Sequence, residues 1–156
     1  MSEAWQSSPM NPIKKLYIAS DHAGFDLKSA LVKYIESKDL KIEDCGCFSK
    51  DSVDYPDYAQ TVAKKVIEDK EAEGILICGS GIGMDIAANR FKGIRAALIY
   101  EPELAVLSRT HNNSNVLVLA ARFTSEEKAK KILDTWLTTK FEGGRHQGRV
   151  DKMDLV

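Results

Sequence analysis

A short apolar run, a glycine loop and the start of a helix follow one another in Gly74-Ile-Leu-Ile-Cys78-Gly79-Ser80-Gly81-Ile82-Gly83-Met84-Asp85-Ile86-Ala87-Ala88-Asn89. The continuous apolar run before Cys78 is typical of a strand that is covered on both faces of a parallel sheet. The glycines at alternate positions let backbone N–H groups face a ligand, and the helix start adds unpaired donors and partial positive charge. We therefore expect an α/β fold with an anion-binding loop at the end of a buried strand.

The same alternation of strand and helix patterns extends along the chain. Strands are expected at 14–20, 40–45, 75–78, 94–100 and 115–120, and helices at 24–37, 57–69, after the glycine loop, at 101–109 and at 124–138. Thr124-Ser-Glu-Glu127 is typical of a capping box at the start of the last helix. Five alternations predict a Rossmann-like, doubly wound three-layer αβα sandwich, in which right-handed crossovers join a five-stranded parallel sheet.

Composition and charge restrict the domain organisation and the partners. The 156 residues, of which 44% are hydrophobic and 29% charged, fit one domain over residues 14–156, with a flexible arm at 1–13. A formal net charge of -1 argues against nucleic acid or a membrane surface as the main partner. No apolar run approaches the roughly 18 residues of a membrane span, and the N-terminus lacks the order of a signal peptide. We expect a cytoplasmic protein with a small-molecule ligand.

The three cysteines are too few and too unevenly placed for a disulfide framework. Cys45 and Cys47 are separated by one residue, whereas the redox motif needs two, so this pair is expected to be structural. No cluster of Cys or His has the spacing of a zinc site, and we expect chemistry without a metal.

Two candidate groups come directly after predicted strands. Cys78 is followed by the glycine loop, whose N–H groups and helix start favour a thiolate, although a lone cysteine there is more often a small buried hydrophobe. Ser20-Asp21-His22 follows the first strand, where Asp21 has the alternative role of a helix N-cap. Because the carboxyl ends of parallel strands share one edge, we expect both groups at the same edge of the sheet.

The remaining candidates also have ordinary structural interpretations. His111-Asn112-Asn113 is suited to ending a helix, and terminal arginines such as Arg145 and Arg149 are commonly solvated. Glycines before these arginines would also let the last segment fold over an anion. Together with the loop, the candidates supply a base, an oxyanion cradle, a ring-opening acid and a phosphate clamp.

Two other classes of site fit the glycine loop poorly. The spacing of the glycines and their place after the third strand depart from the pattern that binds nicotinamide dinucleotides. A cysteine phosphatase would have an arginine six residues after its cysteine, and this position holds Met84.

The pattern resembles the type B ribose-5-phosphate isomerases and the related galactose-6-phosphate isomerase subunits, over residues 14 to about 150. The motifs that carry the resemblance are Ser20-Asp-His22-Ala-Gly24, Asp54-Tyr-Pro-Asp57-Tyr, Ile77-Cys-Gly-Ser-Gly-Ile-Gly83, Ala87-Ala-Asn-Arg-Phe-Lys-Gly-Ile-Arg95, Leu107-Ser-Arg-Thr-His-Asn112 and Glu142-Gly-Gly-Arg-His-Gln-Gly-Arg149. The resemblance implies interconversion of ribose 5-phosphate and ribulose 5-phosphate through a cis-enediolate, with no metal or organic cofactor.

The resemblance also implies roles for individual residues. Cys78 would be the base that moves a proton between C1 and C2, and His111 the acid that assists opening of the furanose ring. The arginines and His22 would bind the phosphate, and Ser80 keeps the hydroxyl of the threonine that is often found there in bacterial relatives. The substrate-binding set would be Ser20, Asp21, His22, Gly79, Ser80, Gly81, Ile82, Gly83, Asn112, Arg122, Arg145 and Arg149.

The order of elements separates the two expected catalytic residues. The helix at 101–109 starts at the edge of the sheet where Cys78 lies and runs back about 13 Å, at 1.5 Å per residue. His111 therefore emerges at the opposite edge. If both residues act on one sugar, a second subunit must supply His111 and Asn112, so we expect an obligate homodimer, or a tetramer, with a shared site.

Two other functions stay open. An isomerase of a six-carbon sugar phosphate, such as allose 6-phosphate or galactose 6-phosphate, would differ in the depth of its pocket, which a sequence does not reveal. A non-catalytic sensor of sugar phosphates would use the same loop and arginines but would not need the thiol of Cys78.

Overall fold

The computed structural model describes residues 15–155, so the expected flexible arm at 1–13 lies outside the described residues. The elements alternate along the chain, as the sequence predicts, and one further helix follows them in the C-terminal segment. In chain order they are β1 (Lys15–Ser20), η1 (His22–Gly24), α2 (Phe25–Glu36), β2 (Lys41–Asp44), α3 (Tyr55–Glu68), β3 (Ala72–Cys78), α4 (Ile82–Ala88), β4 (Ala96–Leu98), α5 (Pro102–Thr110), β5 (Val116–Ala120), α6 (Glu126–Thr138) and α7 (Arg145–Asp151).

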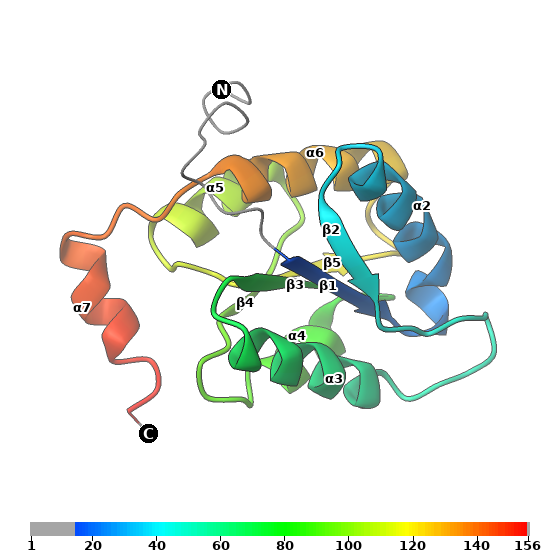
Figure 1. Cartoon of the computed structure of the whole chain (residues 1–156), viewed down its shortest axis with the longest axis horizontal. Coiled ribbons are helices and arrows are strands. Elements are labelled where there is room, and N and C mark those ends of the chain that lie inside the picture. The colour runs from blue at the N-terminus through cyan, green and yellow to red at the C-terminus, as the bar shows by residue number, and fades with distance from the viewer. Residues whose placement is uncertain (1–14, 156) are drawn as a thin grey trace.

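The five strands form one sheet in the order β2-β1-β3-β5-β4, and every pairing is parallel. Helices α2, α5 and α6 cover one face of the sheet, and α3 and α4 cover the other (Figure 1). The predicted doubly wound three-layer fold is thereby confirmed. Among the helices of residues 15–155, none is both long and apolar enough to cross a membrane.

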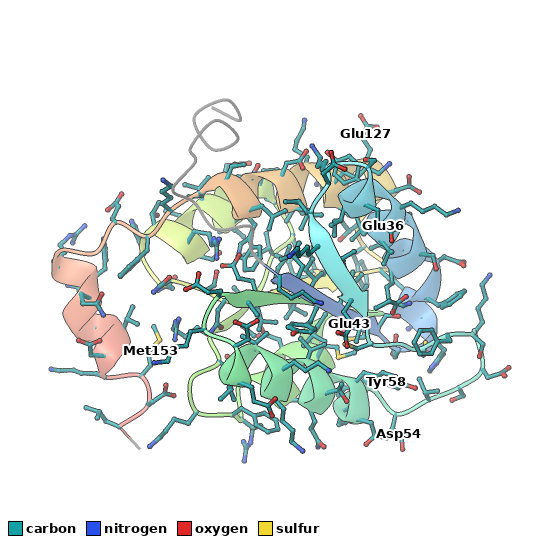
Figure 2. All side chains as sticks on the ribbon, in the orientation of Figure 1. Glu36, Glu43, Asp54, Tyr58, Glu127 and Met153 are labelled. Carbon is teal, nitrogen blue, oxygen red and sulfur yellow. The ribbon has the colours of Figure 1, made fainter. Side chains whose placement is uncertain are left out.

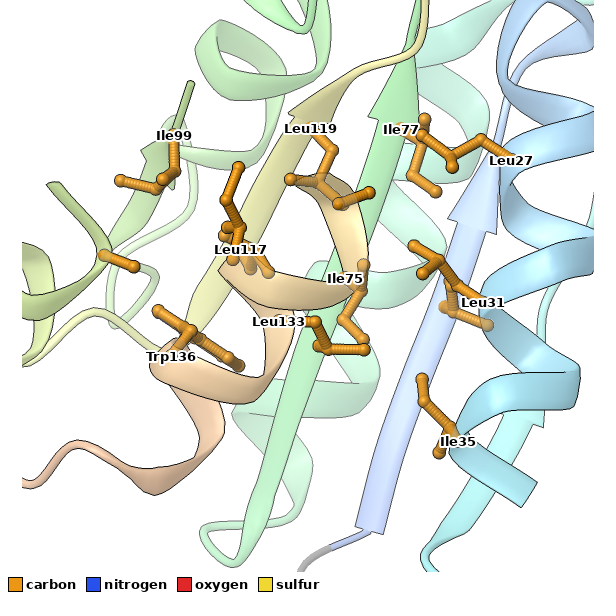
Figure 3. Close-up of a cluster of buried hydrophobic side chains, with 14 of the residues drawn as sticks. Leu27, Leu31, Ile35, Ile75, Ile77, Ile99, Leu117, Leu119, Leu133 and Trp136 are labelled. Atoms are coloured by element: carbon orange, nitrogen blue, oxygen red, sulfur yellow. The ribbon is translucent and has the colours of Figure 1, made fainter. Parts of the chain in front are cut away.

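The hydrophobic core has two halves, one on each face of the sheet. Figure 3 shows the half in which Ile75 and Ile77 of β3 pack against α2 and α6. The alternate residues, Leu76 and Cys78, belong to the other half, with α3 and α4. The alternation of side chains along a strand thus directs Cys78 towards the layer that contains α4, the helix that starts after its own loop.

The two edge strands differ in character. β2 has the sequence Lys-Ile-Glu-Asp, and Glu43 of this strand (Figure 2) binds Lys15 and Lys65 with N–O distances of 3.8 and 3.2 Å. Charges of this kind discourage an exposed edge from pairing with another chain. β4, at the other edge, has the apolar sequence Ala-Ala-Leu and lacks this protection.

Several predicted boundaries differ from the structure: β3 begins at Ala72 instead of residue 75, and α3 at Tyr55 instead of residue 57. Two further differences have a clear local cause. Helix α6 begins one residue later than expected, because the side chain of Ser125 accepts the N–H of Lys128 at 3.1 Å and caps the helix. Thr124, the expected cap, is buried after β5 instead. Strand β4 is shorter than expected, because the side-chain amide of Asn89 binds the N–H and the carbonyl of Ala96 at 2.8 and 3.0 Å and fixes a turn before it.

The C-terminal segment lies at the edge where the strands begin. Figure 1 shows α7 at one end of the molecule, and the arrow of β1 points away from it. The Glu142 N–H donates to the Thr110 carbonyl at 3.1 Å, and the Gly93 N–H donates to the Asp154 carboxylate at 2.9 Å. The segment with Arg145 and Arg149 is therefore bound away from the glycine loop of its own chain.

Candidate active site

The end of β1 lies directly beside β3. The Asp21 N–H donates to the Ile77 carbonyl at 3.2 Å, and the Asp21 carboxylate accepts the Gly24 N–H at 3.1 Å. The interpretation of Asp21 as a helix N-cap is thus confirmed, because its side chain caps η1. A Cβ at Gly24 would lie 2.8 Å from the Ile77 carbonyl oxygen, so only glycine lets this turn pack so closely against the strand that carries Cys78.

Cys78 ends β3 and is 5% exposed. The carbonyls of Cys78 and Gly79 accept the N–H groups of Ala121 and Arg122, each at 2.9 Å, which joins the loop after β5 to the glycine loop. The Arg122 guanidinium lies over Gly79, where an added Cβ would be 3.2 Å from its Cζ. A cation is therefore held over the residue that follows Cys78, at the edge that Ser20 and Asp21 share.

The glycine loop has the free donors that an oxyanion needs. Within residues 15–155, the backbone N–H groups of Gly79, Ser80 and Gly81 have no hydrogen-bond partner. The Ser80 side-chain oxygen accepts the N–H of Ile82 at 3.2 Å, which leaves the hydroxyl proton available. Three amides and one hydroxyl are thus placed around the start of α4, where the helix dipole adds positive potential.

Two tyrosines hold this loop in place, and only one of them had a signal in the sequence. Tyr100 donates its hydroxyl to the Ser80 carbonyl at 3.1 Å. The ring of Tyr55 lies over Gly83, where an added Cβ would be 2.6 Å from the ring. Tyr55 belongs to the motif Asp54-Tyr-Pro-Asp57-Tyr that carries the resemblance, whereas nothing in the sequence around Tyr100 indicates its contact.

His22 is oriented by the loop between β2 and α3. Its Nδ1 accepts the Val53 N–H at 3.2 Å, so the ring proton is on Nε2 when the imidazole is neutral. The same loop binds the end of β1, because the Ser20 N–H donates to the Gly46 carbonyl at 2.7 Å. The loop thus positions both the serine and the histidine of the Ser-Asp-His sequence.

A buried lysine supports this loop. Lys28 is 1% exposed, and its Nζ lies 2.6 Å from the Asp44 carboxylate and 5.3 and 5.4 Å from the ring centres of Phe25 and Phe48. The same Asp44 carboxylate accepts the Gly46 N–H at 2.9 Å. Sequence reasoning missed Lys28, because a lysine on a helix is normally solvated.

Replacing Lys28 by methionine should lower the free energy of unfolding by about 2 kcal/mol, less than for a fully buried pair, because Asp44 keeps some contact with water. Urea unfolding measures the change. Lys33→Met, which removes an exposed lysine from the same helix, is the matched control and should change it by less than about 0.5 kcal/mol. An equal effect of the two substitutions would show that the Lys28–Asp44 pair does not support the loop.

Two titratable groups near the site have shifted pKa values. Burial raises the pKa of the Cys45 thiol to about 11, and the Glu43 carboxylate adds to the shift. Cys45 therefore stays a neutral thiol, which supports a structural role for the Cys45-Gly-Cys47 pair.

Burial also raises the pKa of Asp85, in the first turn of α4, to about 6. A negative charge beside the glycine loop is therefore lost as the pH falls below about 6.

His111 and Asn112 lie at the opposite edge of the sheet. They follow α5 and precede β5, whose first residue pairs with Gly74, whereas Cys78 pairs with the last residue of β5. The strand between these two levels is about 13 Å long, at roughly 3.3 Å per residue. One chain therefore brings together Ser20, Asp21, His22, the loop 79–83 and Arg122, but it does not bring His111, Asn112, Arg145 or Arg149 to them.

His111 contacts the C-terminal segment of its own chain. Its ring stacks on that of His146, with centroids 4.3 Å apart and an angle of 17° between the planes. Ligand atoms of these two residues and Glu142 lie within 4.8 Å of one another. The lone pairs of stacked rings run nearly parallel and do not converge on one ion, so the set does not fit a zinc centre.

A cavity of about 320 Å³ also lies at this opposite edge. Its lining comprises Val66, Ile67, Lys70, Ala72, Glu73, Gly93, Arg95, Asn113 and Asn115. Cys78 and the glycine loop are not part of it, so this cavity is separate from the candidate active site.

The profile of the ribose/galactose isomerase family matches residues 16–153. Ribose-5-phosphate isomerase B of Escherichia coli is 44% identical over 144 residues, which are 92% of this chain and 97% of that protein. A putative sugar phosphate isomerase of Rickettsia bellii is 47% identical over 139 residues, 89% of this chain and 96% of that protein.

Solved structures agree with these sequence matches. A ribose 5-phosphate isomerase of Thermotoga maritima has a TM-score of 0.90 and 50% identity, over 92% of this chain and 99% of that one. Ribose-5-phosphate isomerase B of Mycoplasma genitalium, solved with bound ribulose-5-phosphate, has a TM-score of 0.86 and 43% identity, over 89% of this chain and 93% of that one.

Proposed function

Because the chain belongs to the ribose/galactose isomerase family, we propose that it interconverts ribose 5-phosphate and ribulose 5-phosphate through an enediolate. The observation that carries the proposal is the thiol of Cys78 beside a loop with three N–H groups that have no partner in the described part of the chain. Both lie at the edge where β1 ends, beside Ser20 and Asp21. This combination offers a base and an oxyanion cradle without a metal or organic cofactor.

Cys78 is the base in this mechanism. Its thiolate removes the proton from C2 of the open-chain aldose and returns it to C1, so that the charge develops on O1 and O2 in between. A positioned base contributes ~10²–10⁴-fold, and each preorganised donor to the oxyanion roughly 3 kcal/mol. The amides of Gly79 to Gly81 are the donors, and the Ser80 hydroxyl carries the proton that must pass from O2 to O1.

The phosphate is bound away from the reacting carbons. The Arg122 guanidinium over Gly79 and the Nε2 proton of His22 supply the charge and a hydrogen-bond donor from one chain. Arg145 and Arg149, which are exposed on α7, complete the phosphate site from a second chain. Binding energy from this remote group holds C1 and C2 against the sulfur.

The second chain follows from the separation of Cys78 and His111. Strand β4 forms an apolar sheet edge, and exposed apolar side chains surround it on α4, after β4 and on α5. They are Ile82, Ile86, Tyr100, Leu104 and Leu107. If two copies meet across this edge and are related by a twofold axis perpendicular to the strands, the strands of one copy run antiparallel to those of the other. The carboxyl edge of each sheet then adjoins the opposite edge of the other, so a homodimer completes both sites with the partner's His111 and Asn112.

We also propose that the protein acts in a reducing compartment. Cys45, Cys47 and Cys78 are all free thiols, and a catalytic thiol has to stay reduced to act as a base. The cytoplasm meets this condition.

The test is conversion of ribose 5-phosphate in the presence of a chelator, with wild type and Cys78→Ala side by side. Wild type should be unaffected by the chelator, whereas Cys78→Ala should lose ~10²–10⁴-fold in kcat while it still binds the sugar phosphate. Cys45→Ala removes a thiol that burial keeps neutral and should retain wild-type turnover.

Competing substrates decide the class of sugar in the same assay. Faster turnover of allose 6-phosphate or galactose 6-phosphate would replace the pentose by a hexose phosphate. Binding without turnover of any of the three sugars would contradict the isomerase and indicate a sugar-phosphate sensor.

A further inference from the structure

His146 is buried in a stretch whose neighbours are exposed. Of the five residues from Arg145 to Arg149, four are exposed, whereas His146 is only 5% exposed. Its imidazole ring stacks on the ring of His111, with 4.3 Å between the two ring centroids. The one buried side chain of the short helix α7 thus contacts His111, the expected ring-opening acid. This contact suggests that His146 has a role beyond packing.

The backbone on both sides of the stack is fixed. The Glu142 N–H donates to the Thr110 carbonyl at 3.1 Å, one residue before His111. Arg109 donates its Nε to the Thr139 carbonyl at 3.2 Å, two residues before His111. The segment that leads from α6 to α7 is thus bound to the end of α5, and the stack is a defined contact.

The ring of His111 has little else to orient it. Within residues 15–155 its side chain forms no hydrogen bond, so the face of His146 is the contact that fixes the plane of the imidazole. An acid that opens a furanose must direct its N–H at the ring oxygen, and a misplacement of about 1 Å can cost roughly 100-fold in rate.

We propose that His146 is a positioning residue for His111, whose imidazole plane it holds by stacking. This role rests on the proposed function, in which His111 opens the sugar ring. It acts through His111 and requires no contact between His146 and the substrate.

The charges around His146 agree with a role in stacking. Burial lowers the pKa of His146, and the positive charges of His111, Arg145 and Arg149 lower it further, against the opposing effect of Glu142. The Nε2 of His146 has no hydrogen-bond partner within residues 15–155, and the nearest Glu142 carboxylate oxygen is 3.5 Å away. A His146 ring that stays neutral can stack on His111 without placing a second positive charge against it.

The test compares two substitutions of His146 in the dimeric enzyme with ribose 5-phosphate as substrate. His146→Ala removes the stack and should lower kcat about 10- to 100-fold, with KM within about 3-fold of wild type. His146→Phe keeps a flat ring that takes no proton and should restore kcat to within about 5-fold of wild type. Gln147→Ala, at the next and exposed position of α7, is the matched control and should behave as wild type.

The split between kcat and KM distinguishes positioning from simple damage to α7. If His146→Ala raises KM and leaves kcat unchanged, the residue only holds the arginines of α7, and the inference is overturned. Equal loss in the Phe and Ala variants would overturn it as well. A wild type that does not convert ribose 5-phosphate, with Cys78→Ala indistinguishable from it, would instead overturn the proposed function and remove the basis for this role.

Discussion

Mixing Cys78→Ala with His111→Ala subunits should regenerate about a quarter of wild-type activity. In a mixed dimer, one of the two sites receives Cys78 and His111 in their native forms, while the other receives both substitutions. Random exchange of equal amounts gives about half mixed dimers, each with one competent site of two. The measurement is the rate of ribose 5-phosphate conversion before and after subunit exchange, for the mixture and for each parent alone.

The expected rise depends on a site that is shared between chains. The control mixes Cys78→Ala with the double variant Cys78→Ala/His111→Ala, in which no site can have a native thiol, and it should gain no activity. If the first mixture stays at the mean of its parents after exchange has been verified by mass, Cys78 and His111 do not act on one sugar across an interface. A dilute monomer that retains full turnover would lead to the same conclusion.

The sequence predicts the parts of this site that depend on the order of elements. The apolar run before Cys78 requires burial on both faces, and β3 is in the middle of the sheet. The position of Asp21 beside Ile77 follows from the rule that parallel strands end at one edge. The distance between Cys78 and His111 follows from the length of one helix, which returns the chain to the opposite edge.

Other features depend on packing between distant segments, and the sequence does not predict them. Lys28 lies on the buried side of α2 with Leu27 and Leu31, and the nearby Asp44 and two aromatic rings make its burial favourable. The stack of His146 on His111 joins residues 35 positions apart, without any local pattern. The cap of α6 shifted by one residue because Thr124 and Ser125 are equally suited to the role by type, and only the path of the chain after β5 decides between them.

The second large effect should come from Arg109, which lies two residues before His111. Its guanidinium binds both carboxylate oxygens of Glu73 and, through Nη1, the Ser114 carbonyl at 2.8 Å. Its Cζ lies 4.1 Å from the ring centre of Trp136, whose Nε1 donates to the Ser114 hydroxyl at 2.9 Å. Arg109 and Glu73 are 6% and 5% exposed, so neither charge can turn to water if the other is removed.

Arg109→Met should therefore lower the free energy of unfolding by about 3–5 kcal/mol, because it removes the bidentate ion pair that Arg109 forms with the buried Glu73 carboxylate. Arg109→Lys should also be costly, at about 2 kcal/mol, since an ammonium cannot replace the bidentate contact and the stack on Trp136 together. Urea unfolding at a fixed protein concentration measures both changes.

The double variant Arg109→Met/Glu73→Leu separates the loss of a charge partner from the loss of the contact itself. An apolar pair of similar volume removes the buried carboxylate as well, so the double variant should regain most of the stability that Arg109→Met loses. Its turnover should nevertheless stay below that of wild type, because Arg109 also binds the Thr139 carbonyl and thereby joins the end of α5 to the segment that carries His146. A double variant as unstable as Arg109→Met would mean that the hydrogen bonds to the Ser114 and Thr139 carbonyls, rather than the buried charge, determine the cost.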